Sequence, residues 1–242
     1  MRGWVVPPPK EPTKSPDDFQ KERQQKVRWL LAHGFLRSRR ITEALLRVQR
    51  ENFIPRLYRD YAYIEVPLPL PGEKPTISCP HSYPLFYEPL GLDEGHRFLE
   101  VGLGSGYGAA VAREVVGPEG LVVSVEIDPV TYEFARANLE RAGYSDITLV
   151  LGDGGLGYPG MTPYDRICIT AACAGPPPPL VDQLKPGGRL IVPLEEGEGQ
   201  ELVLHEKREA GLARQVVCTV LYIPLRGAYG SQQTRAERRP PR

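Results

Sequence analysis

Apolar and polar positions follow a helical period in some segments of the chain and form short apolar runs typical of strands in others. The changes between these patterns mark the predicted helices and strands. From residue 17 to Gly34, apolar side chains recur about every 3.6 positions after an acidic start, which predicts an N-terminal helix. Residues 41–50 repeat this pattern and predict a second helix that opens at Thr42, with a break before Pro55. A proline-rich loop over residues 66–75 separates these helices from the rest of the chain.

From residue 97 onward, short apolar runs alternate with helical segments. The runs at 97–102, 121–127, 146–154, 164–172 and 189–194 predict strands, and the segments at 106–117, 128–143 and 178–188 predict helices, the last one short and ending in a turn. Repeated strand–helix units predict an α/β fold, a Rossmann-like, doubly wound, mostly parallel sheet with helices on both faces. No helix separates residues 200–209 from 213–225, so we expect a C-terminal antiparallel hairpin at one edge.

Composition limits the classes of binding partner that we expect. The 242 residues carry 30 basic and 30 acidic side chains, so no net charge attracts nucleic acid or an anionic membrane. Apolar runs stay shorter than the 18 residues that indicate a membrane span, and the N-terminus lacks the apolar stretch of a signal peptide. We therefore expect a monomer with neither nucleic acid nor membrane as a partner.

The termini and the cysteines complete this picture. Residues 1–16 are rich in Pro and Lys and predict a disordered extension, residues 17–230 form the expected domain, and residues 231–242 predict a disordered basic tail. The four cysteines lack CxxC spacing, which indicates reduced thiols and a cytoplasmic protein. His33, His96 and His205 lie apart without metal-ligand spacing, so we expect no metal.

The stretch FLEVGLGSGYGAAVA, residues 98–112, joins the first of the alternating strands to its helix. Its glycines let the backbone turn tightly and let a ligand approach where a Cβ would clash, and the helix start offers free N–H groups. In a doubly wound sheet, ligands bind at the carboxyl ends of the strands, near the point where the strand order reverses. Gly102, Gly104 and Ser105 are therefore candidate ligand-binding residues.

Two ligand classes use such a loop. Gly104, Gly106 and Ala109 match the dinucleotide spacing G-x-G-x-x-G/A, but the strand ends one glycine earlier, at Gly102, and Tyr107 is too bulky for the third glycine's role. Glu100, two residues before the first glycine, would repel a pyrophosphate. The same carboxylate suits a cationic ligand, which favours S-adenosylmethionine, with its ammonium and sulfonium groups, over NAD.

Two more acids follow strand ends. Glu126 closes the next strand and is placed to accept both ribose hydroxyls. Asp153 follows the third strand and is placed to accept from the adenine amino group, with Gly154 giving backbone access. Either acid alone could equally be a helix cap or a solvated turn residue.

Several further motifs lie between residues 19 and 230: RENFIP, TISCPHS, GDGGLGY, PYDRICITAA, LVDQLKPGGRLIVPL and LYIPLRGAYG. Together they resemble the protein-L-isoaspartate O-methyltransferase family over these residues, and TISCPHS is the most specific of them. The resemblance implies a class I S-adenosylmethionine-dependent methyltransferase fold. It also implies methyl transfer to the α-carboxyl of L-isoaspartyl residues in damaged proteins or peptides, which serves repair.

The same resemblance implies the site residues. Ser78 takes the role of an active-site serine, and Thr76, Ile77 and His81 help to close the cofactor and acceptor site. The cofactor-binding set is then Thr76, Ile77, Ser78, His81, Glu100, Gly102, Gly104, Ser105, Glu126, Asp153 and Gly154. From the residues alone, Ser78 could instead be the N-cap of a helix in the following segment.

The sequence departs from the family pattern beside TISCPHS. Lys74-Pro75 replaces the usual Gly-Gln, and Cys79 replaces a usual alanine. These residues flank the acceptor site, so methylation of another peptide carboxylate or of a small molecule stays open. So does a non-catalytic adaptor that binds S-adenosylmethionine and recognises isoaspartyl chains.

Overall fold

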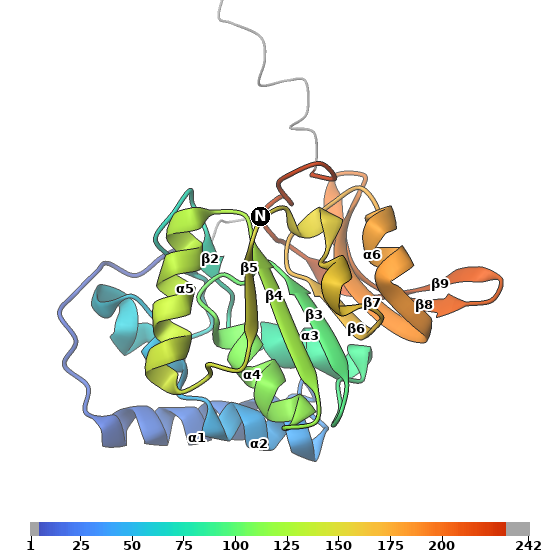
Figure 1. Ribbon diagram of the computed structural model, residues 1–242. Coiled ribbons are helices and arrows are strands. Elements are labelled where there is room, and N and C mark those ends of the chain that lie inside the picture. Colours follow the sequence, from blue (N-terminus) through green and yellow to red (C-terminus); the bar gives the residue numbers. More distant parts are fainter. Residues whose placement is uncertain (1–4, 231–242) are drawn as a thin grey trace, which may run out of the picture.

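A computed structural model describes residues 5–230 (Figure 1). The helices are α1 (Pro16–Ala32), α2 (Arg39–Arg47), α3 (Ser82–Leu90), α4 (Tyr107–Val116), α5 (Pro129–Ala142) and α6 (Pro178–Gln183). Short 3-10 turns are η1 (Arg50–Phe53), η2 (Arg56–Tyr61), η3 (Gly154–Leu156) and η4 (Pro159–Met161). The strands are β1 (Leu68–Pro69), β2 (Thr76–Ile77), β3 (Arg97–Val101), β4 (Leu121–Glu126), β5 (Thr148–Leu151), β6 (Tyr164–Ile169), β7 (Leu184–Glu196), β8 (Gly199–Arg208) and β9 (Gly211–Val220).

The central sheet has the order β5-β4-β3-β6-β7-β8-β9. Strands β3 to β7 pair in parallel, whereas β8 and β9 are antiparallel to their neighbours. The chain moves outward from β3 to β5 and then returns to β6 on the other side, so the order reverses beside β3. The predicted α/β sheet with an antiparallel C-terminal hairpin is confirmed, and its reversal point lies beside the glycine-rich stretch.

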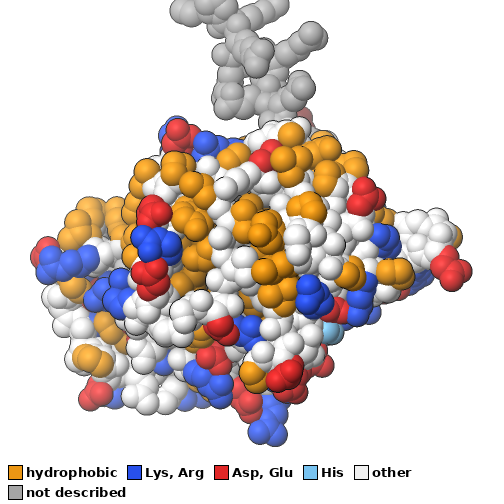
Figure 2. Space-filling model, in the orientation of Figure 1, with side chains coloured by type: hydrophobic (Ala, Val, Ile, Leu, Met, Phe, Trp, Pro, Cys, Tyr) orange, Lys and Arg blue, Asp and Glu red, His pale blue; other side chains and the backbone are white. Residues whose placement is uncertain are grey.

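Two apolar layers hold the sheet between helices. Helices α3, α4 and α5 pack on one face, backed by α1 and α2, and α6 with the short turns η3 and η4 covers the other (Figure 1). The strands are rich in Val, Ile and Leu because both faces are buried. On the face seen in Figure 2, basic and acidic side chains are interspersed, in keeping with the zero net charge.

Side-chain caps define where the first two helices begin. Ser15 and Asp18 form a reciprocal capping box at α1. Helix α2 begins at Arg39, because Ser38 accepts a hydrogen bond from the Ile41 N–H, and it ends at Arg47. The predicted opening at Thr42 is therefore wrong: its hydroxyl donates to the Ser38 carbonyl inside the first turn.

The segment before α1 contacts the domain instead of standing apart as the expected disordered extension. Asp60, in η2, accepts hydrogen bonds from the Thr13 N–H and hydroxyl, both at 2.9 Å, and pairs with Lys10 at 3.0 Å. Burial opposes ionisation of Asp60, but these bonds hold its pKa well below the usual range. Tyr61 also donates to the Pro8 carbonyl. Residues 1–4 and the expected tail at 231–242 lie outside the described residues.

No helix among residues 5–230 has the length and apolar character needed to cross a bilayer.

The turn expected at the end of the segment 178–188 is a bulge inside β7. The register with β6 shifts there, between the pair Tyr164–Leu184 and the pair Arg166–Arg189.

Candidate active site

A cavity of about 560 Å³ opens at the carboxyl ends of the parallel strands. Its floor is formed by residues that follow β3, β4, β5 and β6. Its walls come from the β1–β2 hairpin with the residues after it, and from the segment 220–226 that follows β9. This is the position at which doubly wound sheets bind their ligands.

The glycine loop requires its glycines for two different reasons. Gly102 has a φ of 98°, and a Cβ there would overlap the Thr170 hydroxyl, which donates to the Gly102 carbonyl at 3.0 Å. Gly108, in the first turn of α4, approaches Glu100 so closely that a Cβ would overlap its carboxylate. The loop therefore keeps the backbone open toward the cavity and leaves room for one buried acid.

Glu100 lines the cavity with a side chain that is almost fully buried, at 2% exposure. Its Oε2 accepts from the Ser124 hydroxyl at 2.6 Å. Burial raises the pKa of Glu100 to about 8, against the favourable bond from Ser124. With this pKa the carboxyl is mostly protonated at neutral pH, and a ligand cation would favour its ionised form.

Glu126 ends β4 and faces the same cavity. One carboxylate oxygen accepts from the Gly104 N–H at 3.1 Å, and the other accepts from the N–H groups of Ile127 and Asp128. Burial raises the pKa of Glu126, and these three bonds oppose the rise. The glycine loop and the end of β4 are thus fixed to each other through one acid.

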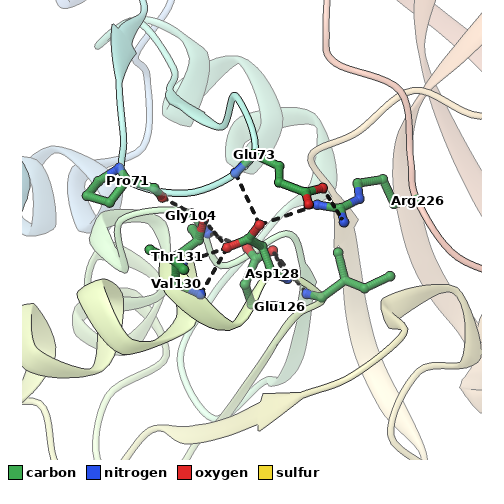
Figure 3. Close-up of polar contacts among 9 residues, drawn as sticks. Pro71, Glu73, Gly104, Glu126, Asp128, Val130, Thr131 and Arg226 are labelled. Atoms are coloured by element: carbon green, nitrogen blue, oxygen red, sulfur yellow. Dashed lines mark hydrogen bonds and ion pairs between the residues drawn. The ribbon is translucent and has the colours of Figure 1, made fainter.

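A network of polar contacts lies beside Glu126 and holds the β1–β2 loop over the cavity (Figure 3). Asp128, the N-cap of α5, accepts from the Glu73 N–H at 3.1 Å, and Thr131 donates to the Pro71 carbonyl at 2.8 Å. Arg226 bridges the Glu73 carboxylate at 2.9 Å and Asp128 at 3.5 Å. Three distant segments are therefore joined at the cavity rim, and we call this network the rim latch.

Asp153 and Gly154 differ in position. Gly154 is buried and lines the cavity, whereas Asp153 is absent from its lining. The Asp153 carboxylate caps η3 through the Gly155 N–H at 2.9 Å and accepts from the Ala228 N–H at 2.7 Å. Both of its oxygens are therefore used to hold backbone, which matches the capping alternative.

The β2 strand and the turn after it carry the TISCPHS string into the cavity wall. Thr76 is exposed at the rim, and Ile77 is buried at 2% exposure. Ser78 is half-buried and lines the cavity together with Tyr222. Helix α3 begins at Ser82 with His81 at its N-cap position. The alternative role of Ser78 as a helix cap is thereby excluded.

His81 lines the cavity next to a small ionic cluster. Its Nδ1 lies 2.6 Å from Glu65, whose other oxygen pairs with Lys26 at 2.8 Å. Within residues 5–230, Glu65, Cys79 and His81 form the one group of three potential metal ligands, with ligand atoms within 4.8 Å of one another. Burial raises the pKa of Cys79 to about 11, so the thiol is protonated, and Lys26 already neutralises Glu65. This cluster is explained by its own hydrogen bonds.

Ten of the eleven residues expected at the site line this one cavity, and Asp153 does not. The sequence interpretation missed several lining residues: Glu73, Asp128, Thr170, Tyr222 and Arg226. Asp128 had a detectable signal, since it directly follows a strand. Tyr222 and Arg226 lie in LYIPLRGAYG, which pointed to the family and not to a role.

The reversal of strand order beside β3, the antiparallel edge and an acid-flanked glycine loop define a methyltransferase of Rossmann-like fold. The sequence matches the family described as Protein-L-isoaspartate(D-aspartate) O-methyltransferase over residues 21–230. The chain belongs to this family.

Individual relatives agree over most of their length. A protein-L-isoaspartate O-methyltransferase of Hyperthermus butylicus is 43% identical, with 93% of this chain and 97% of that protein covered. One of Methanopyrus kandleri is 44% identical, covering 89% and 96%. A solved structure of the same name superposes with a TM-score of 0.80 at 37% identity, covering 86% of this chain and 67% of that one. A Plasmodium falciparum structure titled as a complex with S-adenosyl-L-homocysteine shares the fold, with a TM-score of 0.76 at 22% identity, covering 84% and 98%.

Proposed function

We propose that the protein transfers a methyl group from S-adenosylmethionine to the α-carboxyl of L-isoaspartyl residues in damaged proteins and peptides. The observation that carries the proposal is that one cavity holds both halves of the expected site. The acid-flanked glycine loop lies on its floor, and Ser78 lies in its wall. Family membership supplies the reaction class.

The cavity residues fit the methyl donor. Glu100 offers a buried carboxyl to the cationic methionine end, and Glu126 offers its remaining lone pairs to the ribose hydroxyls. Gly102, Gly104 and Ser105 provide backbone along the floor, and Gly154 borders the adenine end. Asp153 lies outside the cavity lining and holds the backbone of Gly155 and Ala228, so its proposed part is to shape that end of the cavity through η3.

Methyl transfer from a sulfonium to a carboxylate is an in-line displacement, with S-adenosylmethionine supplying the methyl group. A carboxylate is already ionised at neutral pH, because its ordinary pKa is near 4, so no general base is required. The residues of the chain therefore align the acceptor and exclude water, which can be worth about 7–11 kcal/mol.

Ser78 is the proposed orienting group. Its hydroxyl lines the cavity and can donate to one carboxylate oxygen. Thr76 and Ile77 keep the hairpin beside it, and His81, held by Glu65, closes the same wall. The backbone amide nitrogen of the next residue then attacks the methyl ester and expels methanol, which leaves a succinimide. Hydrolysis of the succinimide gives part of the product as normal aspartate.

The partners proposed are isoaspartyl-containing proteins and peptides, bound by a monomer that requires neither nucleic acid nor membrane. A reducing compartment such as the cytoplasm suits the four cysteines, all of which are free thiols.

The proposal is tested with radiolabelled S-adenosylmethionine and an isoaspartyl peptide. Base-labile label on the peptide supports it. Methylation of another carboxylate alone would indicate the alternative acceptor, and binding of the peptide without transfer would indicate an adaptor. Calorimetry adds an independent check: S-adenosylhomocysteine should bind, and tighter binding of NAD would contradict the assignment of the cavity.

A further inference from the structure

Arg50 is a buried cation directly behind the acceptor wall. Its side chain lies at the start of η1 and is 1% exposed. Nε donates to the Ala62 carbonyl at 2.7 Å, and Nη2 donates to the Ser78 carbonyl at 2.6 Å. Nη1 is buried and has no hydrogen-bond partner among the described residues.

The surroundings of Arg50 are neutral. The guanidinium lies over the rings of Tyr83 and Tyr107, at 5.5 and 5.1 Å from their centroids. Burial raises the pKa of both phenols, that of Tyr83 to about 12, so neither carries a charge at neutral pH. Within residues 5–230, Arg50 forms no ion pair, although burial of a charge is costly unless it is paired.

Two acidic residues of this region, the adjacent Glu51 and Glu65 beside Cys79, pair with other cations. Glu51 pairs with Arg23 at 2.8 Å, and Glu65 pairs with Lys26 at 2.8 Å. Each of these carboxylates therefore has a cationic partner other than Arg50. At Cys79 in the cavity wall, burial and the Glu65 carboxylate raise the pKa of the thiol, and Arg50 acts in the opposite direction.

We propose that Arg50 is a positioning residue that makes the acceptor end of the cavity electropositive and fixes the Ser78 backbone, so that the substrate carboxylate is the counter-ion that this buried cation lacks. The inference rests on the proposed function. Arg50 acts through Ser78 and through the wall, without touching the reacting atoms.

The sign of the kinetic effect follows from the chemistry. The acceptor carboxylate is an anion before transfer, and its charge is neutralised as the ester forms. A nearby cation therefore stabilises the bound substrate at least as much as the transition state, and its loss appears in KM for the peptide. At an effective dielectric constant near 20, the attraction of one buried cation for an anion across the cavity wall corresponds to roughly 10-fold in affinity.

The test compares two peptides of identical sequence on protein saturated with S-adenosylhomocysteine. One carries the isoaspartyl α-carboxylate, and the other carries an α-carboxamide in its place. Wild type should bind the carboxylate peptide about 10-fold or more tightly. Arg50→Gln, which keeps a donor and loses the charge, should lose that preference. Arg50→Lys, which keeps the positive charge but loses the branched guanidinium, should retain most of the preference for the carboxylate peptide. Arg39→Gln removes an exposed charge on α2 and should match wild type.

Turnover supplies the second readout. Arg50→Gln should raise KM for the isoaspartyl peptide about 10-fold while kcat changes by less than about 3-fold. The inference is overturned if wild type binds both peptides equally. It is also overturned if Arg50→Gln weakens both peptides alike, which is the result of a purely structural role. If Arg50→Gln does not fold, the wild-type and Arg50→Lys preferences decide. Wild-type methylation of the carboxylate peptide checks the proposed function separately.

Discussion

Replacing Glu100 by Gln should stabilise the free protein and weaken its binding of S-adenosylmethionine. The reason is that Glu100 is 2% exposed and its pKa is raised to about 8 from 4.5 by burial. Between these values the folded state binds a proton that the unfolded chain releases. The resulting penalty is absent below pH 4.5, grows as the pH rises, and levels off above pH 8.

The size of the effect follows from 1.36 kcal/mol per pKa unit. At pH 7 the penalty spans the interval from pH 4.5, which gives about 3 kcal/mol. Gln cannot ionise, so Glu100→Gln should gain up to about 3 kcal/mol in the free energy of unfolding at pH 7 and almost nothing near pH 4.5. The Ser124 hydroxyl donates to Glu100 Oε2, and it can donate in the same way to the amide oxygen of Gln.

Urea unfolding of the ligand-free protein at pH 5, 6, 7 and 8 measures this gain, with the exposed Glu119→Gln as the matched control. Calorimetry should show S-adenosylmethionine affinity lower by roughly 1.5–3 kcal/mol in Glu100→Gln, because a charged partner is lost. The reasoning is refuted if Glu100→Gln is less stable than wild type at every pH, or if it binds the methyl donor as tightly.

Three further substitutions test other parts of the site. Ser78→Ala should lower the single-turnover rate about 100-fold, because misalignment of the acceptor by about 1 Å can reduce a rate by this factor. Cofactor affinity and melting temperature should stay near wild type, and a normal rate would remove Ser78 from the mechanism. Asp153→Ala should cost about 1–2 kcal/mol in urea unfolding, because the η3 cap and the bond to Ala228 are lost; unchanged stability with weaker cofactor binding would support the adenine contact. Glu73→Gln removes one exposed ion pair of the rim latch. The rate of S-adenosylhomocysteine release, measured by stopped flow, should rise by up to about 5-fold and should depend less on salt. Release at the wild-type rate at low salt would show that Arg226 does not hold the loop through this pair.

The sheet could be predicted because its strands are continuous apolar runs flanked by glycines, which is the pattern of strands buried on both faces. The residues at which helices and strands begin and end were harder to predict from the sequence. Ser38 and Thr42 are both acceptable N-caps, and only the backbone geometry shows that Ser38 receives the Ile41 N–H. Likewise, the sequence at 185–188 has turn chemistry, yet pairing with β6 resumes at Arg189 and leaves a bulge.

The residues of the candidate site also differ in how far the sequence could predict their positions. Glu100, Glu126 and Ser78, which line the cavity, could be proposed from the sequence because a strand end or a specific string marks each of them. Asp153 stands at an equivalent strand end, but the competitor for its carboxylate is Ala228, 75 residues away, which no local pattern reveals. The unpaired charge of Arg50 was equally hidden, because it depends on where Glu51 and Glu65 find their cations.

The central claim is that this cavity delivers a methyl group to an isoaspartyl carboxylate. It is tested most directly by mass spectrometry of two peptides of identical sequence, one isoaspartyl and one aspartyl, each incubated with the protein and S-adenosylmethionine. We expect a single added methyl group on the isoaspartyl peptide, lost again as succinimide forms, and an unmodified aspartyl peptide. Equal methylation of both peptides, or modification of neither by a folded protein that binds S-adenosylhomocysteine, would contradict the account.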